Sequence, residues 1–138
     1  MLANGATLSY KKKGAQGEFT KLDGLKEIPE MGMDAEKVEN TSLEDKVKQY
    51  EMGIGDAGDI TYKFKYDNTK ATSPYRVLRA AQDAGEELDF EETLKDGTKT
   101  AFSGFVSVKR TGGGVNGVLE FNLNIALSSD LTITDPAA

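Results

Sequence analysis

The sequence predicts a mainly β protein whose antiparallel sheets form a sandwich or contribute to a barrel, with one short flanking α-helix. Three observations predict this fold class. Apolar and polar residues alternate over fourteen positions in residues 115–128, which is the period of a strand with one buried and one solvated face. Phe102, Val106 and Val108 show the same period in the stretch before it. Only residues 74–84 combine helical spacing with a Ser-Pro start and a glycine at the end.

The two alternating stretches predict one long β-hairpin over residues 98–128. Gly112, Gly113 and Gly114 lie between them and provide the positive φ angles that a reversal needs. At about 3.3 Å per residue a straight second arm would be about 46 Å long. A compact domain of this length is only about 37 Å across. The hairpin must therefore bend, or project from the domain towards a neighbour.

The first third of the chain predicts short strands. Residues 6–12 alternate weakly, with Ala6, Leu8 and Tyr10 on the inward side. Residues 19–28 hold two β-like pieces separated by Asp23 and Gly24, a standard hairpin signal. Residues 35–41 then give a short third strand.

Residues 42–57 are ambiguous between a helical turn and a loop. Leu43, Val47, Tyr50 and Ile54 are three or four positions apart, which suits an amphipathic turn after a cap at Ser42. We interpret the segment as a long, partly ordered loop. Loops of this length are uncommon in compact domains and are usually functional or disordered.

The second half returns to regular structure. Residues 58–66 form a strand with Ile60, Tyr62 and Phe64 inward, and residues 74–84 form the helix. Residues 86–94 form a strand with Leu88 and Phe90 inward, and Leu131 and Ile133 start a possible terminal strand. We expect one domain over residues 1–138, with no C-terminal immunoglobulin-like domain.

Composition excludes several classes of function. The chain has 138 residues, a net charge of −6, no cysteine and no histidine. The missing residue types remove disulfides, thiolate nucleophiles, Ser-His-Asp triads and His-ligated metals. The acidic balance argues against binding nucleic acid by neutralising phosphates, although DNA could pass such a surface without sticking. We expect no membrane span and no signal peptide.

The remaining chemical signals have simpler explanations. Gly53, Gly55 and Gly58 match the dinucleotide pattern, but they lead into a strand instead of a helix. Asp56 and Asp59 lack the oxygen-rich loop of a calcium site. Glu86-Glu87 and Glu91-Glu92 are carboxylate pairs, but Glu87, Asp89 and Glu91 share one strand face. This arrangement fits a solvated acidic face better than a glycosidase pair. We therefore expect no enzyme activity, no cofactor and no metal.

A row of small polar residues marks the outward face of residues 115–128. Asn116, Asn122, Asn124 and Ser128 share this face, which Glu120 interrupts. The row fits an ordinary solvated sheet. It equally fits strands that join those of neighbouring copies and close a large barrel without open edges.

In its order of segments the chain resembles the major tail tube proteins of long-tailed, lambda-like siphophages. The first marks are residues 38–42, VENTS, before a long loop, and Gly58-Asp59 opening an aromatic strand. The short helix before Gly85 and residues 102–104, FSG, at the start of the last hairpin follow in the same order. The resemblance covers nearly the whole chain, and order and spacing carry it.

The resemblance implies a structural subunit that forms hexameric rings, which stack into the hollow tube for DNA ejection. It implies that residues 42–57 stack the rings, with Leu43, Glu44, Asp45, Lys46, Lys48, Tyr50 and Asp56 as contacts. It offers Glu120, Asn122 and Asn124 as lumen-facing candidates, in an acidic pore that repels phosphates.

Further copies of the chain and the tape-measure, tail-tip and tail-terminator proteins would be its partners. Its place would be the virion tail, after synthesis in the host bacterial cytoplasm, in a phage or in a domesticated prophage particle. Two alternatives stay open: a tube subunit of a contractile tail, secretion or bacteriocin machine, and a β-sandwich module that binds a ligand.

Overall fold

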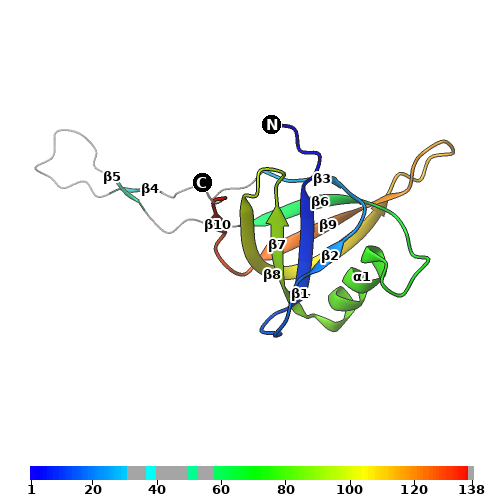
Figure 1. Cartoon of the computed structure of the whole chain (residues 1–138), viewed down its shortest axis with the longest axis horizontal. Helices are drawn as coiled ribbons and strands as arrows, with labels where there is room; N and C mark the ends of the chain where they lie inside the picture. Colours follow the sequence, from blue (N-terminus) through cyan, green and yellow to red (C-terminus); the bar gives the residue numbers. More distant parts are fainter. Residues whose placement is uncertain (31–36, 40–49, 53–57, 137–138) are drawn as a thin grey trace, which may run out of the picture.

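One curled antiparallel sheet makes up most of the protein (Figure 1). The computed structural model describes residues 1–30, 37–39, 50–52 and 58–136. Seven strands are hydrogen-bonded in the order β2-β1-β7-β8-β9-β6-β3, and β10 pairs with β8 beside that path. The strands are β1 (Thr7–Lys12), β2 (Thr20–Leu22), β3 (Leu25–Glu27), β6 (Asp59–Lys65), β7 (Glu87–Thr93), β8 (Lys99–Thr111), β9 (Glu120–Leu127) and β10 (Thr132–Thr134). The mainly β, antiparallel fold class with one short helix is confirmed.

The turn at Asp23 and Gly24 does not make the expected hairpin. The strands on its two sides, β2 and β3, pair with β1 and β6 and lie at opposite ends of the sheet order. A two-residue link can join them only because the sheet curls until its ends approach each other. Gly24 has a φ of 87° and its carbonyl accepts a hydrogen bond from Lys65 N–H at 2.8 Å. Among the described strands the sheet stays open at this point, as a barrel that is not closed.

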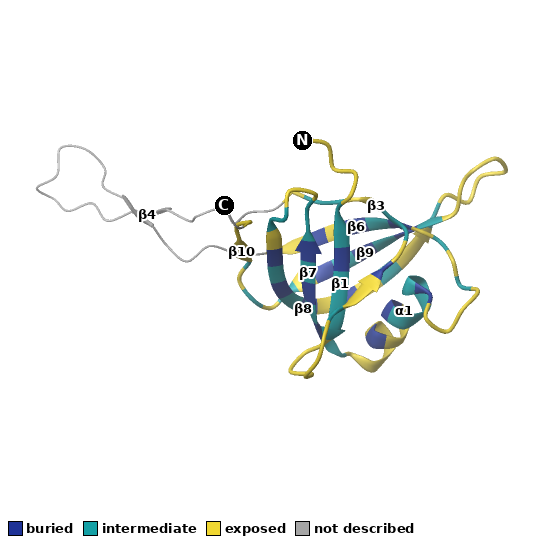
Figure 2. Cartoon of the chain, viewed as in Figure 1, coloured by how far each residue is buried: buried dark blue, intermediate teal, exposed yellow. Residues whose placement is uncertain are grey.

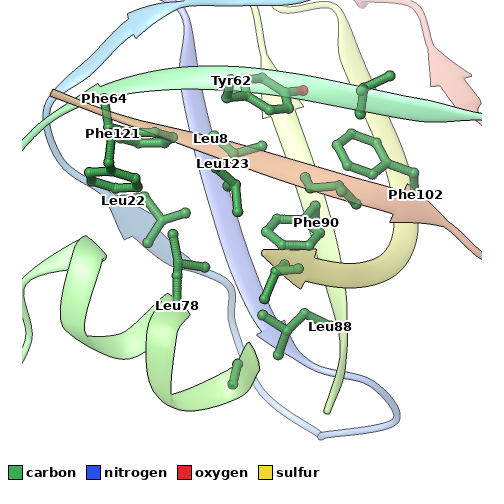
Figure 3. Close-up of a cluster of buried hydrophobic side chains, with 14 residues drawn as sticks. Leu8, Leu22, Tyr62, Phe64, Leu78, Leu88, Phe90, Phe102, Phe121 and Leu123 are labelled. Atoms are coloured by element: carbon green, nitrogen blue, oxygen red, sulfur yellow. The ribbon is translucent and has the colours of Figure 1, made fainter. Parts of the chain in front are cut away.

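Aromatic side chains fill the interior of the curl (Figure 3). Phe102 stacks on Phe90 of β7, with ring centroids 5.6 Å apart, and on Tyr62 of β6 at 6.4 Å. Phe64 and Phe121 form a second stacked pair at 5.3 Å. The Tyr62–Phe102 pair joins β6 and β8, which are not neighbours in the sheet order, so it packs across the concave side of the curl as well as burying apolar surface. The fully buried large side chains are Tyr62, Phe64, Phe90, Phe121, Leu8, Leu78, Leu88, Leu123 and Ile125.

The helix α1 (Pro74–Ala84) has the same bounds as the predicted helix and covers one side of this core. Leu78 and Ala81 are buried, as their spacing predicts. Gly85 ends the helix in the left-handed region, at a φ of 66°. The expected side-chain cap is wrong, because Ser73 Oγ accepts a hydrogen bond from Lys70 N–H at 3.1 Å instead of capping the helix. Gln82 Oε1 ties α1 to the sheet by accepting from Val108 N–H at 2.9 Å.

Strand β8 bends, and this resolves the question of the long hairpin. Its first half lies between β7 and β10, and its second half pairs with β9 from Gly104 onward. Glycine is required at that change of partner, because a Cβ there would lie 2.5 Å from the carbonyl oxygen of Ala126. The base of the hairpin therefore follows the curl, whereas its turn projects beyond the sheet (Figure 1).

The second arm of the hairpin is shorter than predicted. Strand β9 starts at Glu120, and Val115 and Leu119, which the alternation placed on the inward face, are exposed. The apolar alternation continues through these residues, but the glycines at positions 112–114 and 117 turn the backbone out of the ladder. Only Gly112 of the predicted turn glycines has a positive φ, 83°.

Two further strands, β4 (Lys37–Glu39) and β5 (Tyr50–Met52), form a separate antiparallel pair. Lys37 pairs with Met52 and Glu39 with Tyr50. Strand β4 lies inside the predicted third strand. Strand β5 lies inside the segment interpreted as a loop or helical turn, so that interpretation is wrong for residues 50–52.

Candidate assembly surfaces

The outward side of β9 carries the three lumen candidates. Glu120, Asn122 and Asn124 alternate with the buried Phe121, Leu123 and Ile125 and therefore point away from the core. Each lies between one residue of β6 and one of β8. We call this surface the β9 face; it consists of Glu120, Asn122, Asn124 and their neighbours Thr61, Lys63, Lys65, Ser107, Lys109 and Thr111.

Some polar groups of the β9 face have hydrogen-bond partners in the chain and others have none among the described residues. Glu120 forms an ion pair with Lys26 of β3, and this hydrogen bond lowers the pKa of the carboxyl group. Asn124 lies between Thr61 and Ser107. Its Oδ1 is buried and has no hydrogen-bond partner among the described residues. Such atoms are uncommon in folded proteins, because a buried acceptor without a donor costs free energy.

Strand register gives the β9 face a basic character that the sequence pattern did not show. Asn122 lies directly between Lys63 on β6 and Lys109 on β8. Lys65 is the cross-strand neighbour of Glu120. The net charge of −6 belongs to the whole chain. The expectation of an acidic pore and the choice of this face as the pore lining therefore disagree.

The outward side of β7 is acidic, and its groups are paired. We call Glu87, Asp89 and Glu91, with their partners on neighbouring strands, the β7 face. Glu87 accepts hydrogen bonds from Ser128 and from Lys13, whose Nζ lies 2.7 Å away, and these bonds lower the pKa of the carboxyl. Ser103 Oγ donates to Asp89 Oδ1, and Lys99 Nζ lies 3.7 Å from Glu91. The expected solvated acidic face is thus a network of contacts.

One carboxylate of β7 points into the core, although the sequence analysis did not single it out. Glu92 is 3% exposed and accepts a hydrogen bond of 2.6 Å from the hydroxyl of the fully buried Tyr62. Burial raises the pKa of Glu92, against the opposing effect of that hydrogen bond. Burial and the carboxyl group also raise the pKa of Tyr62. The alternation of Leu88, Phe90 and Glu92 already indicated this direction.

The predicted stacking contacts fall mainly where the structure gives no description. Leu43, Glu44, Asp45, Lys46, Lys48 and Asp56 lie outside the described residues. Tyr50 is the first residue of β5 and pairs with Glu39. This register makes residues 40–49 the connection between two paired strands.

Neither a metal site nor a membrane helix is visible in the described parts of the chain. Within those residues, no group of three or more acidic side chains could hold a metal ion. The single described helix is too short and too polar to cross a bilayer.

Comparison with known proteins identifies the family. A family model described as phage tail tube, TTP, lambda-like, matches residues 1–102. The chain belongs to this family. It is thus a tail tube protein of the lambda-like type, and the predicted resemblance is confirmed. No curated protein sequence matches the chain.

Solved structures share the tail tube fold. A chain from the tail of an empty gene transfer agent (GTA) particle, computed with C6 symmetry, is 22% identical with a TM-score of 0.69. The match covers 93% of this chain and 94% of that one. A chain of the native GTA virion is 21% identical with a TM-score of 0.66, and the match covers 92% of this chain and 95% of that one. A chain of the anti-feeding prophage baseplate is 12% identical with a TM-score of 0.64, and the match covers 94% of this chain and 92% of that one.

Proposed function

We propose that this tail tube protein assembles into six-membered rings that stack into the hollow tube through which phage DNA is ejected. The family match over residues 1–102 carries the proposal. The fold supports it as well, because nearly the whole chain superimposes on a subunit from a tail that has C6 symmetry. A ring of identical copies also gives the open edges of the curled sheet something to pair with.

The partners and the place follow from the same assembly. Copies of this chain are the main partner, with tape-measure, tail-tip and tail-terminator proteins at the ends and inside the tube. The subunit is made in the host bacterial cytoplasm, forms part of the virion tail and works as a structural protein without enzyme activity or cofactor. We treat residues 1–138 as a single tail tube domain.

The residues that stack the rings are proposed to lie in the connection between β4 and β5 and in the segment after it. The paired strands support this, because they hold the two ends of residues 40–49 together. A connection of ten residues anchored in this way can reach a neighbouring ring. The contacts in it are Leu43, Glu44, Asp45, Lys46 and Lys48, with Tyr50 and Asp56 beside it.

We propose the β9 face as the lining of the lumen. The amides of Asn122 and Asn124 are neutral, although lysines lie on the same face. The buried Oδ1 of Asn124 has no donor among the described residues. Lys63 and Lys109 lie on both sides of Asn122, so this lining depends on the neutral residue between them. Asn122→Lys would complete a row of three cations, and a basic wall binds phosphates through counterion release.

Electron microscopy of the purified chain tests the proposed function. At high concentration, and with tail-tip complex added, we expect rings and stacked tubes in negative stain. Absence of both under all conditions would refute the tube function. Tubes assembled from Asn122→Lys and from Asn124→Lys should form normally but eject DNA more slowly. Normal ejection by both variants would mean that another face lines the lumen.

A second setting is supported by the likeness to the anti-feeding prophage baseplate. In it the chain would form the tube of a contractile tail, a secretion system or a bacteriocin. Genes for a sheath protein beside this one would favour that setting over a non-contractile siphophage tail.

A further inference from the structure

The turn between β8 and β9 ends in exposed apolar side chains. Val115 is 102% exposed and Val118 is 67% exposed, and Figure 2 shows the turn projecting from the sheet. The turn is tight: Gly117 N–H donates to the carbonyl of Gly114 at 2.9 Å, and a Cβ on Gly112 would lie 2.1 Å from the carbonyl oxygen of Val118. Glycines thus fix the shape of a tip that presents valines to solvent.

An apolar cleft lies between α1 and the adjoining ends of β1 and β7. Its volume is about 440 Å³. Its lining is mainly apolar and also includes Lys12 and Glu86. The apolar lining residues are Tyr10, Val77, Ala80, Ala81, Ala84 and Leu88. A closed apolar cavity of about 150 Å³ holds a benzene molecule, so this cleft has room for a valine side chain.

Charges beside the tip and beside the cleft are complementary. Arg110 and Lys109 are exposed at the stem of the hairpin. Asp83, Glu86 and Glu87 lie at the C-terminal end of α1, where the last turn carries no basic residue. The helix dipole adds negative potential at that end. Lys12 and Lys13 pair with the two glutamates, whereas Asp83 forms no ion pair with any described residue.

We propose that the β8–β9 tip of one copy inserts into the α1 cleft of the next copy, with Arg110 facing Asp83. The tip is exposed in the single chain, so it does not fill its own cleft. A contact between two different surfaces of the same chain is heterologous, and repeated copies of it either close a ring or continue along a tube. The proposal rests on the proposed function, since it names a surface by which tube subunits meet.

Engineered cysteines test the contact directly, because the chain has no cysteine of its own. The double variant Val118→Cys with Ala84→Cys should form disulfides between copies when assembled rings are oxidised. Denaturing gels without reductant should then show a ladder of covalent multimers. The matched control is Val118→Cys with Ala126→Cys. Ala126 is also exposed but lies on the outward side of β9.

A charge exchange tests the same contact without cysteines. Arg110→Glu should raise the critical concentration for assembly about tenfold, the effect of losing roughly 1.4 kcal/mol per contact. Asp83→Arg should do the same, and the two changes together should restore assembly, because each copy then carries the inverted pair. Circular dichroism of each variant checks that the subunit remains folded.

The outcomes separate the two proposals. A ladder specific to the cleft pair, together with rescue in the charge exchange, supports the docking contact. Rings that form without a ladder above the control overturn the contact and leave the tube function standing. Failure of the unmodified chain to form any ring overturns the tube function, and the contact with it.

Discussion

The β7 face and the β9 face are both polar sheet surfaces, but their groups are used differently. On the β7 face all three carboxylates contact a lysine or a serine of the same chain. On the β9 face Asn124 keeps a buried oxygen without a described partner, and Asn122 lies between two lysines. A polar face that is satisfied internally contributes to the fold. A polar face whose exposed side chains lack such contacts is available to another molecule.

The largest contrast lies within β9 itself, between its two sides. Leu123 is 0% exposed, so Leu123→Asp places a carboxylate in the core and should cost more than about 4 kcal/mol, which unfolds the subunit. Asn122→Asp introduces the same group one position earlier, between Lys63 and Lys109, and should leave the chain folded. Urea denaturation followed by circular dichroism distinguishes the two. A cooperative transition for Leu123→Asp near that of the unmodified chain would contradict the assignment of sides.

The buried hydrogen bond between Tyr62 of β6 and Glu92 of β7 gives the next effect in size. Tyr62→Phe removes the hydroxyl that Glu92 accepts from, and leaves a buried carboxyl group without its donor. The cost should be about 1–3 kcal/mol. Tyr66→Phe is the matched control, because the Tyr66 ring packs on Tyr75 and its side chain is only half-buried. Equal losses in the two variants, measured by urea denaturation, would show that the Tyr62 hydroxyl contributes nothing special.

Strand register explains what the sequence could and could not predict on these faces. Alternation placed Asn122 outward and Leu123 inward, because neighbours along a strand always point to opposite sides. It could not place Lys63 and Lys109 beside Asn122, since that requires knowing which strands pair. Glu92 was missed for another reason. Its position in the alternation is inward, but a carboxylate alone in a core is unfavourable until Tyr62 supplies a donor from a distant strand.

The turns show the same limit. The helix of residues 74–84 depends on residues close in sequence, so its bounds could be predicted. The link at Asp23 and Gly24 has the local sequence of a hairpin, yet the curl of the whole sheet decides that its strands find other partners. The start of β9 at Glu120 depends on the close approach of Gly117 to Gly112. A Cβ on Gly117 would lie 2.6 Å from the carbonyl oxygen of Gly112.

The pH dependence of stability should reveal the raised pKa of Glu92. Its pKa is raised in the folded chain, so the folded state binds this proton more tightly than the unfolded state. Its contribution to stability is therefore fully present below the unfolded pKa, near 4.5, and is lost as the pH rises through the folded pKa. The pH range to examine starts near 4.5 and extends upward.

Glu92→Gln isolates this contribution, because the glutamine oxygen can still accept from Tyr62. As the pH rises through that range, the unfolding free energy of the unmodified chain should fall relative to that of Glu92→Gln. Glu87 and Glu120, whose pKa values are lowered, lose their contributions at low pH in both chains and cancel in the difference. A difference that does not change with pH would contradict the raised pKa.

The smallest expected effect compares the two faces on a single strand. Ser103 and Ser107 both point outward from β8, four residues apart, but Ser103 Oγ donates to Asp89 on the β7 face. Ser107 is exposed and lies beside Asn124 on the β9 face. Ser103→Ala should therefore cost about 0.5–1.5 kcal/mol of stability, whereas Ser107→Ala should change it by less than about 0.5 kcal/mol. In assembled tubes the order should reverse if the β9 face meets another molecule, because only Ser107→Ala alters the surface presented to it. Two measurements on the same two variants test this comparison: the stability of the isolated subunit and the critical concentration of assembly. Together they decide whether hydrogen bonding within the chain distinguishes a face that stabilises the fold from a face that binds another molecule.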